Sequence, residues 1–394
     1  EDGIRDVERS RGLGDVYKRQ EDYLAETVRA RTHGPVNDWR KLYEDDLLLV
    51  NARVKADGFD ITGKGRSEIC RLKDGEVLWA RIAREDSGRF ELGDLESLLE
   101  GAAKALPAAP KPPATWDYIW ELVLANAEQI TADFAATGRC GIEGTVEQPF
   151  ALRGSEKDVY VAAGATIHPM VVIDATAGPV HIDAGAEIHP FTRIEGPCWI
   201  GPESVLLGAK CREGCSIGPV CRIGGEVEQS IVQGFTNKYH DGFLGHAYVG
   251  EWVNLGAMTT NSDLRNDYGP VSISLDGRER IDTASIKVGS LIGDHARSSI
   301  GTLLNTGAYV GAMSVLVADG GLLPKFIPSF ASYLRGRITD RFDRETLYAT
   351  AARAMSRRGR DFTEADRAMW DEVFERTADW RRDAARQGRR GGSG

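Results

Sequence analysis

Aliphatic residues recur every six positions along the middle of the chain. The longest run is Ile182, Ile188, Ile194, Ile200 and Leu206. A period of six fits neither the 3.6-residue turn of an α-helix nor the two-residue alternation of a strand. It is typical of hexapeptide repeats, in which each unit forms one short strand and a turn, and three units form a coil of about 18 residues around a narrow apolar core. The pattern therefore predicts a parallel β-helix over 150–326.

Shorter runs surround this one and are separated by two breaks. Their members are Val161, Ile167 and Ile173; Cys211, Ile217 and Ile223; Phe243, Val249 and Leu255; and Ile292, Leu304, Val310 and Leu316, with Ser298 at the intervening position. The period is lost over 224–240, and 261–286 has the character of a long insertion. Loops that leave a solenoid often carry binding groups, so both breaks are candidate functional regions.

The flanking segments have other patterns. Compact or alternating apolar residues predict strands at 46–53 and 77–82. Helical spacing predicts helices at 91–105, at 116–136 with Thr115 as N-cap and Gly138 as its stop, and, after the β-helix, at 333–347, 350–357 and 363–382. The late helices would cap the open end of the solenoid.

The expected organisation is mainly β, with an α/β segment before the β-helix and helices after it. We expect an α/β remnant over 21–109, a connecting helix over 110–140, the β-helix over 150–326 and a helical tail over 327–394. Residues 1–20 are highly charged, have no hydrophobic periodicity and resemble translated adapter sequence, so the native fold is expected to begin near Glu21.

Composition and charge narrow the possible functions. Glycine accounts for 45 of 394 residues, well above the usual share of about 7 %, and we assign the excess to solenoid corners such as Ala184-Gly185, Gly201-Pro202 and Gly218-Pro219. A net charge of −10 argues against nucleic acid as the main partner. The six cysteines have no C-x-x-C spacing, which argues against a zinc ribbon and fits a cytoplasmic protein. No run of about 18 apolar residues indicates a membrane span.

One stretch carries a resemblance to a known family. His240 is followed by Leu244-Gly245, by Ala247-Tyr248-Val249-Gly250 and by Asn254-Leu255-Gly256-Ala257-Met258-Thr259. In this register the chain resembles the acetyltransferase half of the bifunctional UDP-N-acetylglucosamine diphosphorylase/glucosamine-1-phosphate N-acetyltransferase family. The resemblance covers about 115–330 and is closer to a divergent clade of these enzymes than to their best-known branch. The resemblance implies a left-handed β-helix, a homotrimer and transfer of acetyl from acetyl-CoA to the amine of glucosamine 1-phosphate.

The resemblance also implies roles for single residues. His240 matches the catalytic base, and histidine suits that role because its ordinary pKa is near neutral. Asn254 would position the amine, and Ala257 and Thr259 would meet acetyl-CoA. Asp241 and Glu251 are both candidates to orient His240. Each of these residues also has a purely structural explanation, as a corner or solvent-exposed side chain.

Several positions depart from the family. Phe243 stands where the family has Tyr, Met258 replaces a Gly, and the family's sugar-phosphate Arg and Lys fall at Gly224 and near Glu228. The phosphate must then be held differently, or the acceptor differs. The candidate substrate-binding residues are Lys238, Phe243, Arg222, Asn261 and Arg265.

The N-terminal segment resembles only part of the family's nucleotidyltransferase domain. The family's Gly-rich loop with Arg and Lys is absent before residue 100, and 46–53 resembles a strand midway through that domain. We therefore expect no nucleotidyltransferase activity from this chain, although a longer form would carry that domain, and Mg²⁺ would serve only the missing half.

Two other functions remain open. A zinc enzyme on this fold would need three histidines from His168, His181, His189, His240, His246 and His295. We favour a site without metal, because His240 and His246 are six residues apart and fall on different parts of a coil. The main alternative is a non-catalytic β-helix for assembly or regulation of a sugar nucleotidyltransferase, which would bind no CoA.

Overall fold

The computed structural model describes residues 21–32, 36–37, 46–56, 58–90, 95–339 and 341–390, without the side chains of 387–390. The adapter-like stretch 1–20 lies outside these residues. The chain divides into two compact units, Glu1–Tyr118 and Ile119–Gly394.

The first unit contains a small antiparallel sheet. Strands β1 (Leu47–Val50), β3 (Val77–Ile82) and β2 (Glu68–Arg71) lie in that order. The helices are α2 (Asp22–Arg31), α3 (Arg84–Ser87) and α4 (Leu95–Ala105). Leu98 and Ala102 of α4 are buried in one cluster with Ile69, Ala80 and Ile82 of the sheet. Both predicted strands are therefore present, and the predicted helix is present over Leu95–Ala105; residues 91–94 lie outside the described residues.

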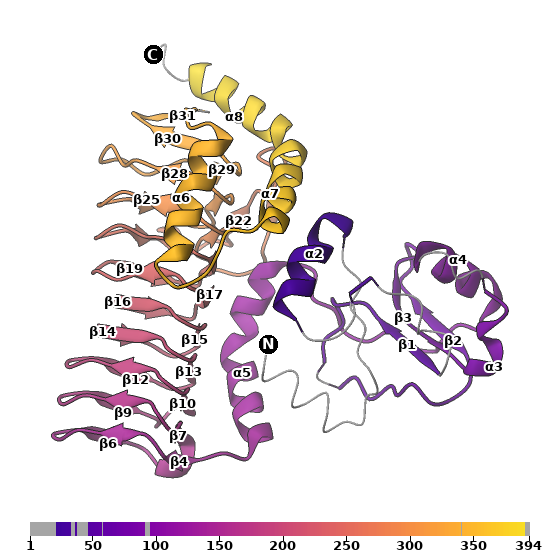
Figure 1. The fold of residues 1–394 in the computed structure, drawn as a ribbon, viewed down its shortest axis with the longest axis horizontal. Coiled ribbons are helices and arrows are strands. Elements are labelled where there is room, and N and C mark those ends of the chain that lie inside the picture. Colours follow the sequence, from indigo (N-terminus) through magenta and orange to yellow (C-terminus); the bar gives the residue numbers. More distant parts are fainter. Residues whose placement is uncertain are drawn as a thin grey trace. The chain divides into compact units, whose positions relative to one another are not determined.

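The second unit is a parallel β-solenoid with three faces, called faces A, B and C here (Figure 1). Face A consists of β4 (Gly141–Ile142), β7 (Val159–Val161), β10 (Val180–Ile182), β13 (Cys198–Ile200), β15 (Cys215–Ile217), β17 (Ile231–Gly234), β20 (Tyr248–Glu251), β24 (Leu291–Ile292), β27 (Tyr309–Val310) and β29 (Phe326–Ile327).

Faces B and C are joined because two strands bend around the corner between them. Face B consists of β5 (Thr145–Val146), β8 (Thr166–Ile167), β11 (Glu187–Ile188), the first parts of β14 (Val205–Cys211) and β16 (Arg222–Glu228), β18 (Asn237–Lys238), the bridge residue Asn254, β25 (Arg297–Ser298), β28 (Val315–Leu316) and β30 (Ser332–Leu334). Face C consists of β6 (Ala151–Arg153), β9 (Val172–Asp174), β12 (Arg193–Glu195), the second parts of β14 and β16, β19 (Phe243–Gly245), β21 (Thr260–Asn261) and β26 (Leu303–Leu304). The chain passes from A to B to C in each coil.

The residues that recur every six positions are those whose side chains point into the core, and they form one column along each face. The repeat residues are buried in one continuous core that includes Ile167, Ile188, Leu206 and Ile223, so the solenoid prediction is confirmed. One register differs. Leu244, not Phe243, is the buried residue of β19, paired with Val227 of β16. The reason is a short corner, since the next inward residue, Val249, follows Leu244 by five positions and not by six.

Glycine serves the corners in two ways. Gly185 has a φ of +70°, as expected for a corner that needs the left-handed region. Gly218 does not, and the positive φ of that corner, +59°, belongs to Val220. A Cβ on Gly218 would lie 1.7 Å from the carbonyl oxygen of Gln233. Gly218 is therefore required by the close approach of the next coil.

Helix α5 (Ile119–Thr137) lies on face A. Asn126 Nδ2 donates to the carbonyl oxygen of Gly214 at 2.8 Å, and Ser216 Oγ donates to Asn126 Oδ1 at 3.0 Å. The helix stops before Gly138, whose φ is +63°, as predicted. Its first residue is Ile119, three residues after the predicted start.

The C-terminal segment contains an unpredicted hairpin. Strand β30 pairs with β31 (Arg337–Thr339) through a turn at Gly336, whose φ is +74°. The predicted helix at 333–347 is therefore wrong over 333–339, because Tyr333 continues the inward column in register with Leu316, and the helix begins only at Arg344. The helices are α6 (Arg344–Ser356), α7 (Glu364–Arg376), which has a Thr363–Asp366 capping box, and α8 (Ala378–Arg390).

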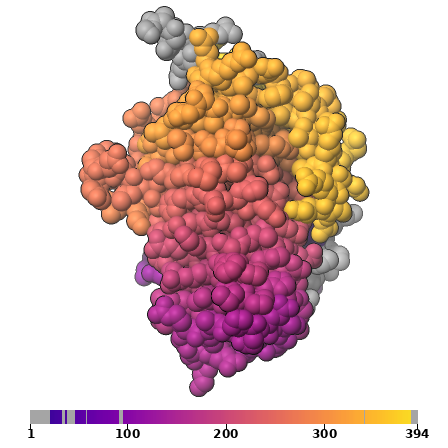
Figure 2. All heavy atoms as spheres, turned by 90° about the vertical axis from the view of Figure 1, so that its left-hand side faces the viewer, coloured from indigo at the N-terminus to yellow at the C-terminus, as the bar shows by residue number. Residues whose placement is uncertain are grey.

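These C-terminal helices cover the A–B corner of the upper coils (Figure 1). Phe235 stacks on Trp252 at a centroid distance of 4.2 Å, and Trp252 lies parallel to His295. Trp370 of α7 packs edge-on against both His295 and Phe330. Figure 2 shows the coils as successive layers with the C-terminal helices along one flank.

The insertion after β21 forms a small hairpin. Strand β22 (Ser272–Ile273) pairs antiparallel with β23 (Ile281–Asp282). Val271, Ile273 and Val288 are buried against Trp120 of α5. The remaining short element is the 3₁₀ helix η1 (Glu156–Asp158).

Candidate functional site

His240 lies at the B–C corner, between β18 and β19. Its side chain is exposed, and its ring packs edge-on against Tyr239 at 5.0 Å. Within the described chain, no hydrogen bond to the imidazole of His240 is found. Asp241 is its chain neighbour, whereas Glu251 ends β20 at the A–B corner, where its N–H donates to Asp294. The imidazole is thus open to a ligand.

Ala257 and Met258 form the same corner one coil above His240. The N–H of Met258 donates to the carbonyl oxygen of Asp241 at 2.7 Å, and the N–H of Gly301 donates to that of Ala257 at 2.8 Å. Large apolar side chains point outward along this corner and define an apolar ridge: Met170 (51 % exposed), Phe191 (75 %), Tyr239 (47 %), Met258 (59 %) and Ile300 (74 %). His240 therefore stands within an apolar, solvent-facing edge.

A column of polar side chains runs up the outside of face B beside His240. Arg222, Asn237, Asn254 and Arg297 occupy equivalent positions on successive coils. Asn237 Nδ2 approaches Asn254 Oδ1 at 3.4 Å, and Arg358, which follows α6, donates to Asn237 Oδ1 at 3.1 Å. Arg222 Nη1 donates to the carbonyl oxygens of Glu203 and Cys221.

Arg297 is a candidate site residue that the sequence analysis missed. Both terminal nitrogens of its guanidinium are buried and lack a hydrogen-bond partner among the described residues. Burial lowers the pKa of Arg297. The signal was available, since Arg297 directly precedes Ser298, the intervening position of the repeat, and so faces outward on face B beside Asn254.

Three of the predicted site residues have their side chains inside the coil. Lys238 is 3 % exposed, and its Nζ donates to the carbonyl oxygens of Gly224 at 2.6 Å and His240 at 3.1 Å. Thr259 Oγ1 and Ser298 Oγ are hydrogen-bonded at 2.8 Å. Asn261 forms hydrogen bonds with both backbone groups of Gly245: Oδ1 accepts from the N–H at 2.8 Å, and Nδ2 donates to the carbonyl oxygen at 2.9 Å.

The other three predicted substrate residues lie outside the coil: Arg222 on face B, described above, and Phe243 and Arg265. Phe243 faces outward on β19, between Glu226 below and Thr260 above, and its N–H donates to Thr260 Oγ1. Arg265 is bound within its own loop, with Nε 2.8 Å from Asp267 Oδ1 and Nη1 3.2 Å from the carbonyl oxygen of Pro270. The hydrogen bond from Arg265 lowers the pKa of Asp267 to about 2.

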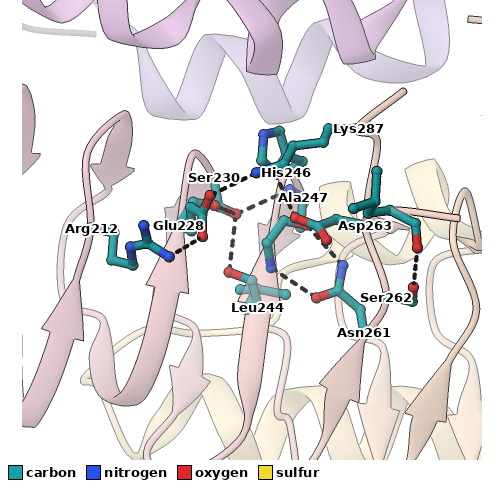
Figure 3. A network of polar contacts seen from close by, with 12 residues as sticks. Arg212, Glu228, Ser230, Leu244, His246, Ala247, Asn261, Ser262, Asp263 and Lys287 are labelled. Carbon is teal, nitrogen blue, oxygen red and sulfur yellow. Dashed lines mark hydrogen bonds and ion pairs between the residues drawn. The ribbon is translucent and has the colours of Figure 1, made fainter. Parts of the chain in front are cut away.

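His246, the nearest competitor of His240, belongs to a partly buried ionic network at the C–A corner (Figure 3). Its Nδ1 is 2.7 Å from Asp263 Oδ2, and its side chain is 3 % exposed. Glu228 binds Arg212 at 2.7 Å and Lys287 at 3.2 Å. His240 and His246 therefore lie on different corners, and the groups around His246 are already paired with one another.

Two groups of side chains bring metal-ligating atoms close together: His168, Glu187 and His189 on the surface, and Glu228, His246 and Asp263 in the network. In the second group Glu228 already binds two cations, which disfavours a metal ion there. The described cysteines are all unpaired. Burial raises the pKa of the Cys211 and Cys221 thiols to about 12, so neither thiolate forms near neutral pH.

Comparison with known proteins gives distant and partial similarity. No protein-family model matches the chain. The bifunctional sugar-1-phosphate nucleotidylyltransferase/acetyltransferase of Sulfurisphaera tokodaii is 33% identical over 87 residues, which are 22% of this chain and 21% of that protein. The bifunctional protein GlmU of Synechococcus elongatus is 31% identical over 134 residues, which are 34% of this chain and 24% of that protein. The chain thus spans a quarter or less of these relatives.

Among solved structures, a hexapeptide transferase family protein from Anaplasma phagocytophilum aligns with 54% of this chain and 87% of its own at 13% identity and a TM-score of 0.16. Among the described residues, none of the helices combines the length and apolar character needed to cross a membrane. The chain is therefore a hexapeptide-repeat β-solenoid with distant, partial sequence similarity to bifunctional sugar nucleotidyltransferase–acetyltransferase proteins.

Proposed function

We propose that this chain is an acetyl-CoA-dependent acyltransferase that N-acetylates an amino sugar phosphate, with glucosamine 1-phosphate as the first candidate. The observation that carries the proposal is the exposed imidazole of His240, which no described residue binds and which stands at a corner beside the polar column of face B. The sequence similarity to the bifunctional enzymes supports it.

In the proposed reaction, His240 removes a proton from the substrate ammonium. The freed amine nitrogen attacks the thioester carbonyl, the C–N bond forms, and the C–S bond breaks. Attack leaves the nitrogen with one proton too many; that proton passes to the departing CoA sulfur, and the imidazolium releases the first proton to water, so the products are the amide, the CoA thiol and one proton. A positioned general base contributes about 10²- to 10⁴-fold to such a step. Backbone N–H groups of the corner would stabilise the oxyanion.

The remaining residues are assigned by position. Asn254, outward on face B, would orient the amine, and the backbone at Ala257 would meet acetyl-CoA. Thr259 would act on that backbone from inside the coil, through Ser298. Arg297, one coil above Asn254 on the polar column, would attract the phosphate, and Arg222, two coils below Asn254, is the alternative cation.

A thiol-release assay with acetyl-CoA and glucosamine 1-phosphate tests the proposal. His240→Ala is expected to lower kcat about 100-fold or more. His189→Ala is the matched control, because His189 is a partly exposed histidine immediately after a face B strand lower in the solenoid, and it should retain activity. An inactive wild-type protein, or an active His240→Ala variant, would contradict the assignment.

The second candidate is a non-catalytic assembly or regulatory β-helix. The enclosure of Lys238, Thr259 and Asn261 within the coil favours it, because these side chains offer nothing to a ligand outside. Isothermal titration with CoA separates the two functions, since the assembly function predicts no binding at all. No nucleotidyltransferase activity is expected in either case.

A further inference from the structure

Lys238 occupies a position that the repeat reserves for aliphatic residues. It follows Val232 by six residues and pairs in register with Ile223 on the coil below, while Leu255 lies on the coil above. A lysine is almost never fully buried without partners. An inward lysine at this level of the solenoid therefore calls for a specific explanation.

The ammonium of Lys238 ends under the corner that carries His240. Its two acceptors are the carbonyl oxygen of Gly224, at 2.6 Å, and that of His240 itself, at 3.1 Å. Hydrogen bonds from an ionised donor are about twice as strong as neutral ones. The side chain thus joins two successive corners from inside the coil.

The coil below is shaped to receive this corner. A Cβ on Gly225 would lie 2.8 Å from both Asp241 Cα and Lys238 Nζ, and a Cβ on Gly224 would lie 2.1 Å from the carbonyl oxygen of Tyr239. Because Gly224 and Gly225 have no side chains, the 239–242 segment packs directly on the lower coil, and the Lys238 ammonium lies between this segment and the glycine pair. From above, the N–H of Met258 donates to the carbonyl oxygen of Asp241 at 2.7 Å.

We propose that Lys238 is a positioning residue for His240, whose buried ammonium fixes the B–C corner and so the placement of the imidazole against the acyl acceptor. This deepens the proposed acyltransferase function and rests on it for its catalytic consequence. It also gives Lys238 a role that needs no contact with substrate. A shift of about 1 Å in a catalytic group can cost roughly 100-fold in rate.

The charge state of Lys238 adds a pH dependence. Burial lowers its pKa to about 8, against the opposing effects of Cys211 on β14, Asp241 on the corner and Glu226 on β16. The Cys211 thiol is neutral at that pH, because burial raises its own pKa to about 12. Below pH 8 the ammonium is charged and its hydrogen bonds are strong. Above pH 8 it becomes a neutral amine, and the corner loosens.

Hydrogen–deuterium exchange on the full chain tests the positioning without requiring activity. The reporters are the amides of Phe243 and Met258, which bind Thr260 and Asp241 across this corner. Lys238→Met should raise their exchange rates about tenfold at pH 7, a loss equal to about 1.4 kcal/mol. Ile223→Met, an apolar exchange at the paired core position, should leave them unchanged. Equal rates in wild type and Lys238→Met would overturn the inference.

A measurement on wild type alone covers the case in which Lys238→Met does not fold. The ratio of exchange rates of Met258 and Gly301 cancels the intrinsic pH dependence of exchange, because Gly301 binds Ala257 one coil further up. This ratio should rise between pH 7 and 9 with a midpoint near 8. A ratio that stays constant would overturn the inference.

Kinetics then connect the corner to the reaction. Lys238→Met should lower kcat about tenfold or more with KM for acetyl-CoA unchanged, and its alkaline pH limb should lack the wild-type component near pH 8. The Ile223→Met control should match wild type. If wild type is inactive, the acyltransferase proposal fails, yet the exchange data still decide whether Lys238 holds the corner.

Discussion

Arg297 places a charged guanidinium inside the solenoid wall, and its two terminal nitrogens have no hydrogen-bond partner among the described residues. A buried donor without a partner costs about 1–3 kcal/mol. Arg297→Met should therefore raise the free energy of unfolding by about 1 kcal/mol. The variant also lacks the guanidinium that would bind the phosphate, so KM for a phosphorylated acceptor should rise about tenfold. Thermal unfolding and steady-state kinetics measure the two effects.

The matched control for this prediction is Arg337→Met, which removes an exposed arginine from β31. It should change neither stability nor KM. If Arg297→Met destabilised the fold and left KM for the acceptor unchanged, Arg297 would be a structural residue and the phosphate would have to bind elsewhere.

At this scale the sequence predicts position better than environment. Counting six from Val232 puts Lys238 on the inward side, and counting six from Leu255 does the same for Asn261. The sequence motif nevertheless suggests that these polar residues contact a ligand. Their actual partners are backbone groups on other coils, which the motif does not show. The two bonds of Asn261 to Gly245 span sixteen residues, and nothing in the motif records them.

Among the elements, the insertion depends on ionic anchors at its two ends. Asp263 near its start binds His246, and Lys287 at its end binds Glu228. Burial alone would raise the pKa of Asp263, but the hydrogen bond and charge of His246, together with Lys287, outweigh it and lower the pKa. A carboxyl with a lowered folded-state pKa stabilises the fold above its ordinary pKa of about 4 and loses that effect as pH falls below it.

Asp263→Asn should therefore lower the free energy of unfolding by about 1–3 kcal/mol at pH 7 and flatten its decline below pH 4. Thermal unfolding between pH 3 and 7 gives this profile, and hydrogen exchange over 262–287 locates it. Asp282→Asn is the control within the same insertion, because Asp282 is an exposed carboxylate on β23. An unchanged pH profile in Asp263→Asn would show that the anchor does not hold the insertion.

Predictability of the elements depends on which interactions define them. The coils repeat one interaction, so their period is visible in the sequence. The β30–β31 hairpin is not visible, because Tyr333 has helical spacing with later apolar residues and is fixed as a strand only by pairing with β28. Likewise, the five-residue spacing from Leu244 to Val249 shifts the register of Phe243 in a way that only the neighbouring coil reveals.

For the whole molecule, the apolar ridge is the feature that a single chain leaves unexplained. The A–B corner has its aromatic side chains covered by α6 and α7, and the C–A corner is closed by the ionic network and the insertion. Along the B–C corner, Phe191 and Ile300 remain 75 % and 74 % exposed. Because the expected homotrimer would bring corners of neighbouring solenoids together, we expect the ridge to be buried between subunits around His240.

Ile300→Glu should then dissociate the trimer into monomers, because the carboxylate would be buried among apolar side chains without a partner. Light scattering after size-exclusion chromatography measures the mass, and activity should fall with it if the neighbouring subunit completes the site. Tyr268→Glu is the control, since Tyr268 is 70 % exposed on the insertion, outside the ridge. A wild-type monomer would remove the trimer from the proposal, and an Ile300→Glu trimer would move the interface to another face of the solenoid.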